Sequence, residues 1–67
     1  MTEPRDPDTI IREINDLNQV IAHTQKTLQQ FPDDQLLQIA LQQDQHRKKT
    51  LAKELHLSLT LYLYQLV

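Results

Sequence analysis

Histidines are the first side chains in this 67-residue sequence to consider as metal ligands or proton carriers. His23, His46 and His56 lie far apart along the chain, and no HExxH or His-x-x-x-His spacing places two of them on one helical turn. The sequence contains no cysteine, which excludes thiolate ligands and disulfides. We therefore expect surface histidines, no metal site and no cofactor.

Carboxylates and a serine are the remaining candidates for acid–base or nucleophilic chemistry. The carboxylates are scattered, although Glu13 and Glu54 can approach each other across a helical hairpin. A two-helix unit offers little concavity in which a carboxylate could be buried. Ser58 is the only serine and has no catalytic motif around it, and the absence of glycine excludes a glycine-rich phosphate loop. We expect no catalysis.

Basic residues gather in one place, at Arg47, Lys48, Lys49 and Lys53. Such a cluster can contact phosphate, but a solvated helix face explains a run of this length equally well. The formal net charge of the chain is −2, so no overall attraction draws it to nucleic acid or to an anionic membrane. Nucleic-acid contact through these four residues is kept as the alternative interpretation.

We expect helices to carry these groups. Gln, Leu, Lys and Glu, which are good helix formers, dominate the chain after its last proline, Pro32. We predict an all-α fold: a flexible lead-in at 1–6, then one domain at 7–67 with helices at about 7–30 and 34–66 and a turn at 31–33. Asp6 is the expected N-cap of the first helix, with Pro7 at its first position.

The first helix carries apolar residues at alternating spacings of four and three, which is a heptad pattern. Its members are Ile10, Ile14, Leu17, Ile21, Leu28 and Phe31, with Thr24 filling the missing step. Pro32 disfavours helical geometry at Phe31, and Asp33 is the predicted N-cap of the second helix. A connection this short makes the two helices antiparallel.

The second helix begins with apolar residues that point in nearly all directions, from Leu36 to Leu41. One partner helix cannot cover such a segment, which indicates oligomerisation. Residues 42–49 are wholly polar, so Asp44 or Lys48 has to lie along the contact with the first helix.

The C-terminal tail, residues 55–67, supports two interpretations. Leucines alternate with polar or aromatic residues from Leu55 to Tyr64, which is typical of a half-buried strand. Leucine also favours helix, no turn residue interrupts the chain, and a lone strand lacks a partner. We predict a continuous helix and keep the strand as the alternative. As a helix, residues from Leu59 onward extend beyond the first helix and expose apolar surface.

These patterns predict a homo-oligomer, dimer or tetramer, that acts as a protein-interaction or scaffold module. A small regulatory or antitoxin-like protein that contacts nucleic acid, or a larger protein through the tail, is the alternative. A dozen apolar-leaning residues are too few to span a membrane, and an acidic N-terminus argues against a signal peptide, so we expect a cytoplasmic location. The predicted oligomer interface comprises Leu36, Ile39, Leu57, Leu59, Leu61, Tyr62, Leu63, Tyr64 and Leu66.

Overall fold

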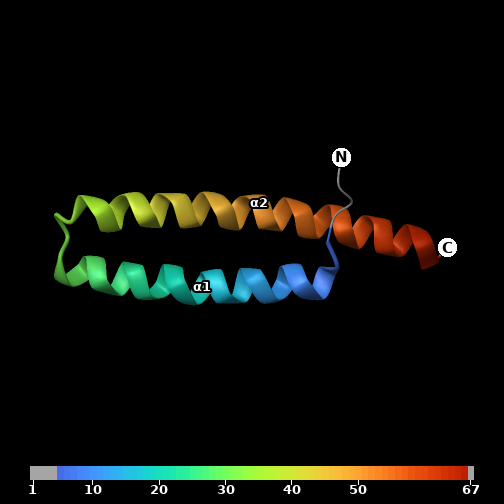
Figure 1. Ribbon diagram of the computed structural model, residues 1–67, viewed down its shortest axis with the longest axis horizontal. Coiled ribbons are helices and arrows are strands. Elements are labelled where there is room, and N and C mark those ends of the chain that lie inside the picture. Colours follow the sequence, from blue (N-terminus) through green and yellow to red (C-terminus); the bar gives the residue numbers. More distant parts are fainter. Residues whose placement is uncertain (1–4, 67) are drawn as a thin grey trace.

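Two antiparallel α-helices form the structure, a computed structural model that describes the backbone of residues 5–66 and the side chains of residues 5–64. α1 spans Pro7–Gln30 and α2 spans Gln35–Leu66, and they lie side by side as a hairpin (Figure 1). The predicted all-α hairpin is confirmed. The tail is helical as far as Leu66, so the strand alternative is wrong. Neither described helix is long and apolar enough to cross a membrane.

The connection between the helices is a β-turn that begins at Phe31. The N–H of Phe31 donates to the carbonyl of Thr27, but its φ of −131° and ψ of 68° end α1 because Pro32 follows. The N–H of Asp34 donates to the carbonyl of Phe31 at 3.1 Å, which places Pro32 at the second turn position, where proline is favoured. Phe31 is exposed, so it is not part of the seam predicted for the first helix.

The N-cap of α2 is Asp34, and the predicted cap at Asp33 is wrong. The N–H of Leu37 donates to Oδ1 of Asp34 at 3.1 Å, as expected when a side chain caps the third residue of a helix. Asp33 is a residue of the β-turn, so α2 begins one position later than the charge pattern suggests. Asp6 occupies the N-cap position of α1, but its side chain makes no capping hydrogen bond.

The core of the hairpin is a narrow seam between the helices. Among the described residues, Ile10, Ile21 and Leu51 are the buried hydrophobic side chains, and Thr24 and Ser58 are the buried polar ones. The Thr24 hydroxyl donates to the carbonyl of Val20, so it reaches the seam with its hydrogen bond already satisfied.

On α2 the seam follows the same alternating spacing, which puts polar residues in its middle. The inward seam of α2 consists of Leu37, Leu41, Asp44, Lys48, Leu51, Leu55 and Ser58. Asp44 is half-buried, whereas Lys48 is exposed. The α2 side of the seam is therefore polar at Asp44 and Lys48, and Ile21 of α1 supplies a buried apolar side chain near this stretch.

α2 is longer than α1, with 32 residues against 24, and it projects past the beginning of α1 (Figure 1). Leu59 and Tyr62 line a hollow together with Pro7 and Ile11, so their side chains still lie beside the beginning of α1. Ser58 lies beside Arg5, which precedes α1, so the projecting part begins near Leu59.

Candidate interaction surface

Arg5 ties the start of the chain to both helices. Its Nη1 and Nη2 donate to the two carboxylate oxygens of Glu13 at 2.6 and 2.7 Å. Its Nε and Nη2 donate to the two oxygens of Glu54 at 3.0 and 2.9 Å. Both pairs have the bidentate geometry in which a planar guanidinium binds a carboxylate most specifically. We call Arg5, Glu13 and Glu54 the arginine clamp.

The arginine clamp changes the acidity of its members. Hydrogen bonds from Arg5 hold the pKa of Glu13 and of Glu54 below the ordinary value, because they stabilise the charged carboxylate. Hydrogen bonds to Glu54 and then to Glu13 raise the pKa of Arg5 further above its usual value. The positive guanidinium also separates two carboxylates that would otherwise repel each other.

Ser58 completes the attachment, because its buried hydroxyl donates to the backbone carbonyl of Arg5. The proximity of Glu13 and Glu54 was expected from the sequence, but the roles of Arg5 and Ser58 were not. Arg5 belongs to the lead-in predicted at 1–6, of which residues 1–4 lie outside the described residues. The signal for Ser58 was its place on the inward seam of α2, where a polar residue needs a partner.

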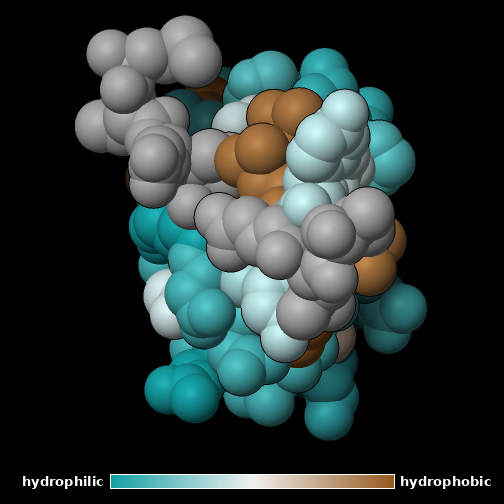
Figure 2. Space-filling view, turned by 90° about the vertical axis from the view of Figure 1, so that its right-hand side faces the viewer, coloured by the Kyte–Doolittle hydropathy of each residue, from teal (hydrophilic) through white to brown (hydrophobic). Residues whose placement is uncertain are grey.

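The tail of α2 exposes large apolar side chains on both of its flanks. All of the predicted interface residues between 57 and 64 are exposed: Leu57, Leu59, Leu61, Tyr62, Leu63 and Tyr64. Figure 2 looks at the end of the hairpin where the tail lies, and hydrophobic residues gather mainly in its upper half, over α2. The side chain of Leu66 lies outside the described residues.

A second apolar patch lies at the opposite end of α2. Leu36 and Ile39 point away from α1 and are 79% and 51% exposed, whereas Leu37 and Leu41 are half-buried on the inward seam. The apolar residues at the start of α2 thus divide between the hairpin core and the outer surface. α2 therefore carries exposed apolar side chains near both of its ends.

Arg47 lies on a different side of α2 from Lys49, whereas Lys53 follows Lys49 by four residues and shares its face. Lys48 and Lys49 line a hollow of about 560 Å³ on one side of the hairpin, and Arg47 lines a different one with Glu13 and Asp16. Consecutive helix positions are about 100° apart, which separates Arg47 from Lys49 by most of a half-turn. The acidic neighbours of Arg47 further reduce any attraction to phosphate at that position.

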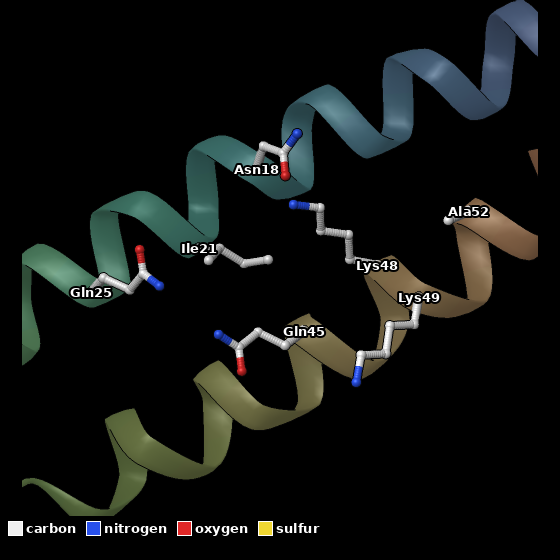
Figure 3. A pocket seen from close by; sticks show the side chains of 7 residues that line it. All are labelled: Asn18, Ile21, Gln25, Gln45, Lys48, Lys49 and Ala52. Carbon is white, nitrogen blue, oxygen red and sulfur yellow. The ribbon is translucent and has the colours of Figure 1, made fainter.

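The hollow beside Lys48 is lined mainly by polar side chains (Figure 3). Ile21 points into the space between the helices, and Gln25, Gln45 and Lys48 surround it, while Lys49 points away from α1 (Figure 3). The side chains thus offer amide groups and one ammonium group along an open groove.

The histidines stay separate in the structure. His23, His46 and His56 are all exposed. Within residues 5–64 no group of three histidine, cysteine, aspartate or glutamate side chains is close enough to hold a metal ion.

Comparison of the chain with protein families, with curated proteins and with solved structures gave no match.

Proposed function

We propose that this protein is a small homo-oligomeric helical module that serves protein interaction or scaffolding and performs no catalysis. The observation that carries the proposal is the exposed apolar surface of α2, at Leu36 and Ile39 near its start and from Leu57 to Tyr64 in its tail. Monomeric proteins seldom leave contiguous apolar surface of this kind in water. A second copy of the chain would cover it.

The small internal core supports the same proposal. Only Ile10, Ile21 and Leu51 are buried hydrophobic residues among those described, and α2 contributes the polar residues Asp44 and Lys48 to the middle of the seam. A chain of this size buries only about 60% of its unfolded surface when it folds alone, and disulfides are excluded by the absence of cysteine. Association supplies the missing apolar burial.

A role in nucleic-acid binding through Arg47, Lys48, Lys49 and Lys53 has weaker support, because Arg47 lines a different hollow from Lys48 and Lys49 and lies beside Glu13 and Asp16. Binding that depends on phosphate contacts falls steeply with salt, so it should be sought at low ionic strength. We expect no retardation of double-stranded DNA or single-stranded RNA by micromolar protein at 50 mM salt. Retardation that disappears at higher salt would favour the regulatory alternative.

The proposal is tested by light scattering behind size exclusion on two matched double variants. In one, Leu57 and Leu61, which are 56% and 47% exposed, are replaced by glutamine. In the control, Ile11 and Val20 of α1, which are 42% and 49% exposed, are replaced by glutamine. Point substitutions are preferable to truncation after His56, because truncation also removes Ser58 and its bond to Arg5.

We expect the control variant to keep the mass of the unsubstituted oligomer and the Leu57→Gln, Leu61→Gln variant to dissociate. Glutamine is a good helix former, so a loss of helix content measured by circular dichroism in the Leu57→Gln, Leu61→Gln variant alone would follow from dissociation and not from helix propensity. If the unsubstituted chain is already monomeric and fully helical at all concentrations, the proposal of a homo-oligomer is wrong.

A further inference from the structure

α2 carries a second heptad series one position before the inward seam, about 100° around the helix from it. The outward seam, with alternating spacings of four and three, consists of Leu36, Ala40, Gln43, Arg47, Thr50, Glu54, Leu57, Leu61 and Tyr64. All are exposed except Ala40 and Glu54, which are half-buried. A helix with a heptad seam on each of two sides can pack against two other helices.

The outward seam is symmetric in its chemistry. Its apolar members occupy the two ends, Leu36 and Ala40 at one and Leu57 to Tyr64 at the other. Its polar members, Gln43 to Glu54, occupy the middle. A segment with apolar ends and a polar centre is complementary to a reversed copy of itself.

We infer that two copies of the chain pair through their outward seams, with the two α2 helices antiparallel about a twofold axis near the Lys48–Lys49 peptide. This inference rests on the proposed self-association and specifies its surface. In this register Leu36 lies opposite Leu61 of the second copy, and Ala40 lies opposite Leu57. Each contact occurs twice, as an isologous interface requires.

The polar centre fits the same register. Gln43 lies opposite Glu54 of the second copy and Arg47 opposite Thr50, which brings Arg47 within one helical turn of the second Glu54. Glu54 is already paired with Arg5, so it enters the interface with its charge compensated. A parallel pair in register would instead place Arg47 against Arg47 and Glu54 against Glu54, and like charges at such positions are unfavourable.

The outer half of α2 sets an upper bound on the area that a second copy can cover. α2 has 32 residues, and at 1.5 Å per residue it is about 48 Å long. Half the circumference of a helix of about 10–12 Å diameter is about 16–19 Å, so the outer side of α2 presents about 750–900 Å². Specific interfaces bury about 800 Å² per partner.

A contact between the two tails alone would leave the other apolar patch in water. Leu36 lies 28 residues before Tyr64, about 42 Å away along the helix, and is 79% exposed. Antiparallel pairing places Leu36 of each copy against the tail of the other copy, so one interface covers both apolar ends of the outward seam.

Disulfide trapping distinguishes these arrangements, because the chain contains no cysteine of its own. Equal amounts of Leu36→Cys and Leu61→Cys chains are mixed, unfolded and refolded together, and oxidised mildly at low micromolar concentration. A disulfide needs Cβ atoms about 3.5–4.5 Å apart. The products are identified by intact mass and on non-reducing gels. The matched control mixes Val20→Cys with Leu61→Cys, because Val20 is comparably exposed on α1.

We expect a cross-link between Cys-substituted positions 36 and 61, and none in the Val20 control. Two copies of position 61 would lie about 38 Å apart in the antiparallel register, so Leu61→Cys alone should not cross-link. A link between two copies of position 61 would overturn the antiparallel register while leaving self-association intact. An oligomer that gives no disulfide link, or gives equal amounts of link in both mixtures, would also overturn the antiparallel register. A monomeric chain would overturn both the register and the proposed function.

Discussion

Replacement of Ile10 by alanine tests whether the inward face of α1 is correctly assigned. Ile10 is wholly buried, with 0% of its side chain exposed. The substitution removes three carbons, which at about 0.8 kcal/mol each is a transfer loss of about 2.4 kcal/mol. Residual cavity adds to this, and buried Ile→Ala changes cost about 2–5 kcal/mol in total.

The position of Ile10 in α1 narrows the range expected for the loss in free energy of unfolding. It lies in the first turn of α1, where neighbouring chain can relax into the space, so we expect about 2.5–3.5 kcal/mol. For a domain of this size each kcal/mol lowers Tm by about 4–8 °C, which gives a decrease of roughly 10–28 °C. The assay is urea and thermal unfolding followed by circular dichroism. All chains are compared at one concentration, because association contributes to stability by mass action.

Ile11→Ala is the matched control, since it makes the same change at the next residue. Ile11 is 42% exposed and lies outside the heptad series of α1 that faces α2. We therefore expect its replacement to lower the free energy of unfolding by less than about 1.5 kcal/mol. Both substitutions have the same small effect on helix propensity. Equal losses at the two positions, or a larger loss at Ile11, would refute the assigned face and with it the register of the hairpin.

Two further predictions concern the ends of the helices. Asp34→Ala removes the hydrogen bond to the N–H of Leu37 and should cost about 1 kcal/mol in urea unfolding, whereas Asp33→Ala should cost much less; the reverse order would contradict the cap. The pKa of Glu13 and of Glu54 is lowered on folding, so the arginine clamp stabilises the fold above the ordinary value near 4.5 and loses this effect as pH falls below it. Between pH 7 and pH 3, Tm should therefore decrease more in the unsubstituted chain than in Arg5→Gln; parallel curves would show that the clamp does not contribute.

The hairpin could be predicted from sequence because its signals are local and consistent. Pro7 and Pro32 mark the helix starts, and the heptad spacing from Ile10 to Leu28 marks the inward face. The helix of the tail was harder to predict, because alternating leucines satisfy both a strand and a helix. Leucine's helix propensity and the uninterrupted chain from α2 decided in favour of helix.

The details that sequence reasoning missed depend on contacts between distant segments. Arg5 precedes the first helix, and nothing local indicates that it reaches Glu54. Asp33 and Asp34 are chemically identical cap candidates, and only the β-turn that starts at Phe31 decides between them. Ser58 has no motif, but its place on the inward seam beside the start of α1 gives its hydroxyl a backbone partner.

The central claim is that the exposed apolar surface of α2 is covered by another copy of the same chain. Sedimentation equilibrium on the unsubstituted protein, from low micromolar to several hundred micromolar, tests it most directly. We predict a mass of two or four times the 7.9 kDa chain mass, as expected for a dimer or a tetramer. The oligomer should dissociate on dilution. A mass of 7.9 kDa across the whole range, with full helix content, would contradict the claim.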